Sequence, residues 1–332
     1  MAKKVTLKDV AVKAGVSEKD AEKILENAPF KDEQAKVKVL RAAAELEYKH
    51  EPRALGRKSK TIALMAPFFY SPFVSEIVDG IEKKLVGTSY NASQYSTKGV
   101  LENERAIFRR VLETNMADAF ILFNIPVDED ILREIKQKKI PLISIEKELP
   151  FFNFIVTDNM HGSFVGTEHL IKQGRKNIGI VIGKRYQPDI QNDRIKGYMN
   201  ALDENGLKFD DNSIIVINEH DFDNGAEVFN SVIQQRKDLD AIFCMAGDIV
   251  ATGIITEAKK RGVKIPEDLA IIGYDDLEIA RYITPPLTTI RQPTRKMGEK
   301  AVELIIDYLT GREPPKPTEI VFKSELIKRE SA

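Results

Sequence analysis

Residues 61–86 read TIALMAPFFYSPFVSEIVDGIEKKLV, a nearly continuous apolar run followed by a stretch with apolar residues at helical spacing. Such a run is typical of a strand buried on both faces, and the stretch after it predicts a helix over 72–86. Strands of the same kind are predicted at 91–97, 119–123, 141–145, 154–159, 177–183, 213–218, 241–245 and 269–276. Helices are predicted between them, over 102–114, 128–138, 162–172, 192–204, 225–235 and 248–261. This alternation predicts doubly wound α/β architecture.

The strands are too many for one open sheet, and the pattern divides near Asp158 and Asn159. The last predicted strands, at 288–293 and 319–328, are expected to cross back between two lobes. We therefore expect an N-terminal lobe of residues 61–158 with 291–320 and a C-terminal lobe of residues 159–290 with 321–332. Because ligands of such sheets bind at the carboxyl ends of the strands, a binding site is expected where the lobes face each other.

Residues 1–48 follow a helical pattern of their own. Thr6 is expected to cap a helix over 7–14 that ends at Gly15, Ser17 to cap a second, and Asp32 a third. Two helices joined by a glycine-containing turn predict a helix-turn-helix. Residues 1–60 carry 15 Lys and Arg against 10 Asp and Glu, while the remainder carries 35 against 41. This asymmetry is expected if only the head meets a polyanion, although a charged helical cap fits the same numbers.

Composition excludes other classes of protein. In the 332 residues, no apolar run approaches the ~20 residues of a membrane helix, so no membrane partner is expected. The first residues lack the apolar core of a secretory signal, and the single Cys244 cannot form an internal disulfide. These features predict a cytoplasmic protein.

Catalytic motifs are absent from the sequence. The four histidines, at positions 50, 161, 169 and 220, lack zinc-site spacing, and no phosphate-binding glycine loop or Gly-x-Ser-x-Gly elbow occurs. Cys244 lies inside an apolar strand, where a small buried residue is expected. We therefore expect no enzyme, no metal and no cofactor. A periplasmic transport receptor is disfavoured, because a head is fused to the body and no signal peptide is present.

Motifs along nearly the whole chain resemble the lactose/galactose-repressor (LacI/GalR) family of bacterial transcription regulators. The matching segments, in order, are 6–11 (TLKDVA), 14–17 (AGVS), 38–48, 71–73 (SPF), 157–159 (TDN), 193–198 (DRIKGY), 265–268 (IPED), 272–276 (IGYDD), 286–290 (PLTTI) and 325–327 (ELI). The resemblance implies a DNA-binding head at 1–48, a hinge at 49–60 and a periplasmic-binding-protein-like core of two lobes. It also implies a homodimer on a palindromic DNA operator, with effector control of operator binding.

The resemblance places DNA contacts in the first two helices, at Thr6, Ser17, Glu18, Lys19 and Lys23. The second helix departs from the family, because residues 18–26 read EKDAEKILE where small polar, DNA-reading residues are typical. An acidic side chain can accept a hydrogen bond from cytosine N4, so Glu18 remains a candidate base reader. Four acids together favour lost or altered DNA binding.

The hinge, residues 50–59 (HEPRALGRKS), is shorter than the family pattern by roughly two residues. By position Leu55 is the minor-groove wedge, with Arg53, Arg57 and Lys58 near phosphates. A basic flexible linker is the alternative.

Effector contacts are implied at Arg194 and Asp275, since the family commonly uses both positions. Arg194 offers a donor fork and Asp275 two acceptor oxygens, which suits the hydroxyls of a sugar or sugar derivative. Alternatively, the two residues pair with each other or cap helices. Asp248 is either an N-cap or a ligand contact, and the amide that the family places before it is here Gly247.

Further effector candidates come from the N-terminal lobe. Phe68, Phe69 and Tyr70 follow a strand and form either a stacking wall or part of the core. Glu146 and Lys147 take the family's Asp-Arg position, where Lys147 meets an anionic ligand or lies on solvated surface.

Three functions are weighed. The first is an effector-responsive repressor, motivated by the ordered match and the basic head. The second is a ligand or protein sensor whose head no longer binds DNA specifically, motivated by the acidic second helix and the short hinge. The third, an enzyme, lacks a motif. The resemblance leaves open a protein corepressor, the sign of regulation and the identity of the effector.

Overall fold

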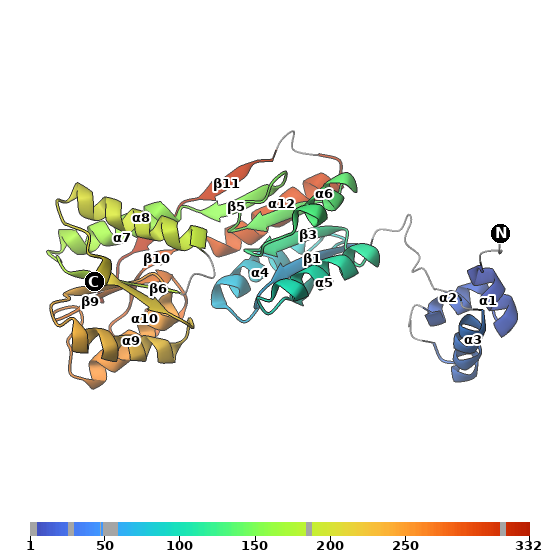
Figure 1. Ribbon diagram of the computed structural model, residues 1–332, viewed down its shortest axis with the longest axis horizontal. Coiled ribbons are helices and arrows are strands. Elements are labelled where there is room, and N and C mark those ends of the chain that lie inside the picture. The colour runs from blue at the N-terminus through green and yellow to red at the C-terminus, as the bar shows by residue number, and fades with distance from the viewer. Residues whose placement is uncertain (1–4, 26–29, 47, 49–58, 184–187, 313–316) are drawn as a thin grey trace. The chain divides into compact units, whose positions relative to one another are not determined.

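The computed structural model describes residues 5–25, 30–46, 48, 59–183, 188–312 and 317–332 (Figure 1). The head contains three helices, α1 (Leu7–Ala14), α2 (Glu18–Leu25) and α3 (Glu33–Glu45). Their apolar faces enclose one small core, to which each helix contributes, with Val10, Ala21 and Val39 completely buried.

The helix ends of the head follow the sequence prediction. Thr6 and Asp9 form a reciprocal capping box at the start of α1. Gly15 ends that helix at a φ of 68°, a left-handed conformation that favours glycine. Asp32 caps α3 by accepting hydrogen bonds from the backbone N–H groups of Gln34 and Ala35. The predicted helix-turn-helix head is therefore present.

The first lobe is built on a parallel six-stranded sheet with the strand order β11-β5-β4-β3-β1-β2. Its strands are β1 (Thr61–Ala66), β2 (Asn91–Ser96), β3 (Ala119–Phe123), β4 (Leu142–Ile145), β5 (Asn153–Thr157) and β11 (Glu319–Phe322). Its helices are α4 (Pro72–Leu85), α5 (Leu101–Glu113), α6 (Glu129–Gln137) and α12 (Thr294–Leu309). Strand β3 is buried along its whole length, as the apolar run predicted.

The second lobe repeats this plan with the order β12-β10-β9-β8-β6-β7, in which only β12 runs antiparallel to its neighbour. Its strands are β6 (Ile178–Gly183), β7 (Ile214–Ile217), β8 (Ala241–Cys244), β9 (Ala270–Asp275), β10 (Thr288–Arg291) and β12 (Glu325–Ile327). Its helices are α7 (Asn159–Lys172), α8 (Pro188–Glu204), α9 (Phe222–Gln235), α10 (Asp248–Lys260) and α11 (Ile279–Tyr282), with a short 3-10 turn at Asp211–Ser213. The predicted fold class is confirmed.

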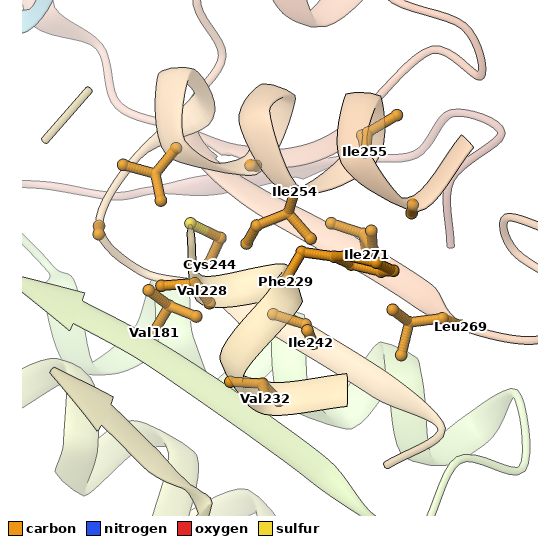
Figure 2. Close-up of a cluster of buried hydrophobic side chains, with 14 of the residues drawn as sticks. Val181, Val228, Phe229, Val232, Ile242, Cys244, Ile254, Ile255, Leu269 and Ile271 are labelled. Carbon is orange, nitrogen blue, oxygen red and sulfur yellow. The ribbon is translucent and has the colours of Figure 1, made fainter. Parts of the chain in front are cut away.

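Apolar side chains cover both faces of the second sheet. Leu170 of α7 and Tyr198 of α8 pack on one face, and Phe229 of α9 and Ile254 of α10 pack on the other. Figure 2 shows the second cluster, in which Cys244 is enclosed by aliphatic side chains. Burial raises the pKa of the Cys244 thiol, so it stays protonated and acts as a small apolar group.

The chain passes between the sheets at three places. Strand β5 leads into α7, β10 leads into α12, and β11 leads into β12. The predicted crossing of residues 319–328 between the lobes is confirmed, but the single strand is wrong, because Lys323 and Ser324 separate two strands that belong to different sheets.

Helices α7, α8 and α9 begin three or four residues earlier than predicted. Asp158 and Asp221 cap α7 and α9 by accepting from backbone N–H groups three residues later. Gly162 and Gly225, at which two of these helices were predicted to begin, lie inside the helices at close contacts. A Cβ at Gly162 would meet the Tyr274 hydroxyl at 2.6 Å, and one at Gly225 would meet the Val250 carbonyl oxygen at 2.2 Å. Packing, not a helix start, therefore explains both glycines.

Candidate functional site

Arg194 lies on α8 and is held on several sides. Its guanidinium stacks over the Tyr274 ring, with Cζ 3.7 Å from the ring centroid. Its Nε donates to Asn159 Oδ1 at 2.8 Å, and its Nη1 donates to the Met245 carbonyl at 2.6 Å. Only 9% of the residue is exposed. A cation fixed in this way is pre-organised to donate its remaining N–H groups to a ligand.

Asp275 ends β9 in the left-handed region, at a φ of 104°. Its Oδ1 accepts a hydrogen bond from Gln292 Nε2 at 2.6 Å. Burial raises the pKa of the Asp275 carboxyl, while the charge of Arg194, the hydrogen bond from Gln292 and the charge of His220 lower it. Arg194 stacks on Tyr274 and donates to the Met245 carbonyl, so Arg194 and Asp275 both lie at the carboxyl ends of the strands of the second sheet, where the fold predicts a ligand.

The glycine at position 247 is explained by its contact with Asp275. A Cβ at this position would lie 3.1 Å from Asp275 Oδ2, and the φ of Gly247 is 110°. The amide side chain that the family places here would meet the Asp275 carboxyl. The observed conformation of Asp275 therefore favours glycine at position 247.

Glu146 was placed by the sequence only as the neighbour of Lys147, and its own role in the site was not predicted. It follows β4 with a φ of 61° and is buried. Its Oε1 accepts from Thr157 N at 2.7 Å and Thr157 Oγ1 at 2.8 Å, and its Oε2 accepts from Asn159 Nδ2 at 3.2 Å. Burial raises the pKa of its carboxyl, against the hydrogen bonds from Thr157 and the charge of Arg194. The available signal was its position as the first charged residue after the strand predicted at 141–145.

His220 was also missed, having been considered only for zinc spacing. Its Nδ1–H donates to the Ala246 carbonyl at 2.9 Å. Its ring lies against Gly183, where an added Cβ would meet Nε2 at 2.0 Å. His220 therefore stands over the carboxyl ends of β6 and β8, beside Asp275.

Asp248 has a different environment from Asp275. It is completely buried, its Oδ1 accepts from Thr289 Oγ1 at 2.6 Å, and its Oδ2 accepts from Leu277 N at 2.8 Å. Burial is the first cause that raises its pKa well above the ordinary value, followed by the neighbouring charge of Asp275. Gly247, not Asp248, occupies the N-cap of α10. The structure therefore favours a supporting role for Asp248, which ties α10 to β10 and to the loop after β9.

Asp276, the second acid of the pair, accepts from Arg291 Nε at 2.7 Å and from Arg329 Nη2 at 2.5 Å. Both contacts lie within the second lobe. Asp276 thus fixes the end of the chain against β10, which leaves Asp275 as the acid that faces Arg194.

The aromatic candidates divide into two groups. Phe69 packs into the core of the first lobe, with its ring 6.1 Å from Phe123. The ring centroids of Phe68 and Tyr70 lie 5.2 Å apart, and Tyr70 is 80% exposed. Phe68 and Tyr70 therefore remain candidates for a stacking wall, while Phe69 is a core residue.

Lys147 is half-buried, and its Nζ lies 3.8 Å from Asp189 Oδ2 on α8. The structure thus gives this lysine a carboxylate neighbour from the other lobe.

In the head, Thr6 and Ser17 act as caps. The Ser17 hydroxyl donates to Asp20 Oδ2 at 2.7 Å and accepts from Asp20 N at 3.1 Å. Ala21 and Ile24 face the core, whereas Glu18, Lys19 and Lys23 are exposed. Two lysines therefore lie on the exposed side of α2, and Asp20 is held in a capping interaction. The hinge candidates Arg53, Leu55, Arg57 and Lys58 lie outside the described residues.

Among the described residues, no helix is both long and apolar enough to span a bilayer. In the same segments, no group of three or more His, Cys, Asp and Glu side chains is placed to hold a metal ion.

Comparisons with known proteins agree with this arrangement. Residues 167–332 match the family model of the periplasmic binding protein-like domain. The chain is 31% identical to the "HTH-type transcriptional repressor PurR" of Photobacterium profundum, over 92% of both chains. It is 30% identical to the "HTH-type transcriptional repressor CytR" of Escherichia coli, over 92% of this chain and 90% of that one.

Solved structures show the same fold. A LacI family transcriptional regulator from Enterococcus faecium, with bound ribose, has a TM-score of 0.71 at 26% identity and covers 82% of this chain and 98% of its own. The structure described as "transcriptional regulator CelR-cellobiose complex" has a TM-score of 0.74 at 24% identity, over 99% and 100% of the two chains.

A helix-turn-helix head joined to two parallel-sheet lobes, with Arg194 and Asp275 at the strand ends where ligands of such sheets bind, defines a ligand-controlled, DNA-binding transcription regulator. The chain belongs to the LacI/GalR family of bacterial transcription regulators, as its motifs predicted.

Proposed function

We propose that this protein is a homodimeric repressor without catalytic activity, which acts in the cytoplasm on a palindromic operator. Its ligand is a sugar or sugar derivative bound where the two lobes meet. The carrying observation is the fixed Arg194 beside the half-buried Asp275. We propose the domain limits 1–48, 49–60, 61–158 with 292–322, and 159–291 with 323–332, which move the predicted limits at 290/291 and 320/321 so that β10 and β11 each stay within one lobe. A protein corepressor stays a further hypothesis.

The chemistry of this site suits an uncharged polyhydroxy ligand. Arg194 offers N–H donors, and Asp275 offers an acceptor oxygen that Gln292 does not use. Phe68 and Tyr70 supply flat apolar surface for one face of a ring. Bound ribose and cellobiose, named for the two structural relatives, are ligands of this kind. Lys147 has a carboxylate neighbour already, so an anionic ligand is a weaker alternative.

The surface of α2 favours retained DNA binding over a head that has lost it. Asp20 is engaged by Ser17, and the two lysines at positions 19 and 23 are exposed. Exposed lysines attract phosphates whatever the base sequence, while Glu18 is left as an acceptor for a base edge. We therefore propose an operator whose sequence differs from those read by small polar residues, with Leu55, Arg53, Arg57 and Lys58 in the minor groove or near phosphates.

Regulation follows if the ligand prefers one arrangement of the lobes. A ligand shifts such an equilibrium only by its difference in affinity for the two arrangements, with couplings typically of ~1 to 3 kcal/mol. The hinge then transmits the change to the spacing of the two heads.

The test is a selection of bound duplexes from a random pool by the full-length protein, followed by a salt titration. We expect a palindrome whose binding falls steeply with salt. Ribose, cellobiose and other sugars are then added to the complex, and one is expected to change the operator affinity in wild type but not in Arg194→Ala. No enriched duplex at low salt, with a folded protein, would contradict DNA recognition by the head.

A further inference from the structure

Four side chains form a row of polar contacts where the chain passes between the two sheets. Thr157 Oγ1 lies 2.8 Å from Glu146 Oε1 and also 2.8 Å from Gln292 Oε1. Gln292 Nε2 lies 2.6 Å from Asp275 Oδ1. Glu146 follows β4 and Thr157 ends β5 in the first sheet, whereas Asp275 ends β9 and Gln292 follows β10 in the second. The row therefore connects the two lobes.

The row needs three hydrogen atoms, one for each contact between electronegative atoms. The Thr157 hydroxyl supplies one, and the Gln292 amide supplies one, because only its nitrogen end donates. Two ionised carboxylates supply none. One contact would then hold two oxygen atoms at 2.8 Å without a hydrogen between them.

Rotating the amide does not remove this shortage. If Gln292 turned its nitrogen towards Thr157, its oxygen would face Asp275 Oδ1, and the missing hydrogen would move to that contact. In the first orientation the extra proton lies on Glu146, and in the second on Asp275. Both orientations require one proton on the carboxyl pair.

The surrounding charges lead to the same count. Arg194 stacks on Tyr274, the residue before Asp275, and it donates to Asn159, which in turn donates to Glu146. The charge of Arg194 acts on both acids, and that of His220 acts on Asp275. Glu146, Thr157 and Gln292 are buried, where an uncompensated charge is costly. Two negative charges beside one guanidinium leave an excess, whereas one shared negative charge balances it.

We propose that Glu146 and Asp275 share a single proton through Thr157 and Gln292. Glu146, Thr157 and Gln292 then act as positioning residues for Asp275. The raised pKa of both acids agrees with this. One consequence rests on the proposed function: a ligand hydroxyl that donates to Asp275 favours the proton on Glu146. Ligand binding in one lobe would then be felt at the end of β4 in the other.

Infrared difference spectra of the full-length protein at pH 7, without ligand, test the shared proton. A protonated carboxyl gives a C=O band distinct from that of a carboxylate. We expect Glu146→Gln and Asp275→Asn each to remove the same single band. Both variants are suitable, because an amide mimics the protonated acid and Asn tolerates the positive φ at position 275. The buried acids Glu104 and Asp248 are present in all three proteins, so their bands cancel.

Three outcomes would overturn the proposal: neither variant loses a band, only one does, or each loses a separate band. Thr157→Val removes the linking hydroxyl, and Thr157→Ser keeps it. In the Thr157→Ser background, Glu146→Gln and Asp275→Asn should again remove the same carboxyl band. In the Thr157→Val background they should not remove the same band. Circular dichroism confirms the fold of each variant. Because no ligand is involved, a wrong ligand assignment leaves these spectra unchanged.

Discussion

Charged side chains mark both the exposed side of α2 and the region between the two lobes, but their surroundings differ. Lys19 and Lys23 are exposed to water. Arg194 is buried and held by Asn159, Met245 and the Tyr274 ring. An exposed charge changes affinity for a polyanion and leaves folding nearly untouched, because water screens it. A buried charge supports its neighbours, so its removal should affect folding and binding together.

The largest expected effect is at Arg194. Arg194→Ala removes two hydrogen bonds and the stacking on Tyr274, and it leaves Asn159 Oδ1 and the Met245 carbonyl without this donor. We expect the free energy of unfolding to fall by ~3 kcal/mol, measured by urea denaturation, with loss of sugar binding. The control is Arg133→Ala, which removes an exposed arginine paired with Glu129 and should cost less than ~0.5 kcal/mol. Equal losses of stability at the two positions would show that burial does not determine the cost of removing an arginine.

Effects at α2 should be smaller and confined to DNA. Lys19→Ala and Lys23→Ala should each weaken operator binding by roughly tenfold and lower the slope of affinity against salt by about one. The unfolding free energy should change by less than ~0.5 kcal/mol, since both side chains are exposed. Electrophoretic mobility shifts over a salt series measure the first effect. Lys83→Ala in α4 is the matched control, and an equal loss there would argue against specific use of α2.

The same difference in surroundings explains how far the sequence could predict this molecule. Buried strands such as β3 were predictable because continuous apolar runs admit few other structures. Arg194 and Asp275 were chosen from motif position, and both lie at the carboxyl end of β9, while their contact with a ligand stays a prediction. The role of Asp248 and the position of Glu146 were not, because both depend on contacts between segments far apart in the chain. For Asp248, sequence showed a helix start but not that Thr289 and Leu277 would occupy its oxygens.

The outward surface of α2 illustrates the opposite case. Residue types along 18–26 indicated four acids near the DNA, but a linear sequence does not show which of them are engaged by a neighbour. Asp20 is bonded to Ser17, whereas Glu18 is exposed. The interpretation of an acidic DNA-facing surface therefore changes with local geometry, even though the helix itself was predicted.

The smallest expected effect is at Glu104 on α5, a buried acid without an oppositely charged partner beside it in the part of the chain that the structure describes. This residue is buried in the first lobe, its Oε1 accepts from Thr97 Oγ1 at 3.3 Å, and its Oε2 has no hydrogen-bond partner among the described residues. Burial raises the pKa of its carboxyl, with the Thr97 bond acting in the opposite direction. Unlike Glu146, it does not have Arg194 beside it to favour the charged form.

A raised pKa means that folded Glu104 binds its proton more tightly than the unfolded chain does. Its contribution to stability is therefore complete below the unfolded value of 4.5 and is lost as the pH rises through the folded pKa. Glu104→Gln stays neutral at every pH. The unfolding free energy of the variant minus that of wild type should therefore be more positive at pH 8 than at pH 4. Urea denaturation at both pH values measures this, with the exposed Glu102→Gln as control. A difference with the opposite sign would mean that Glu104 is stabilised as an anion, and that burial alone does not separate the acids of the body from the exposed charges of α2.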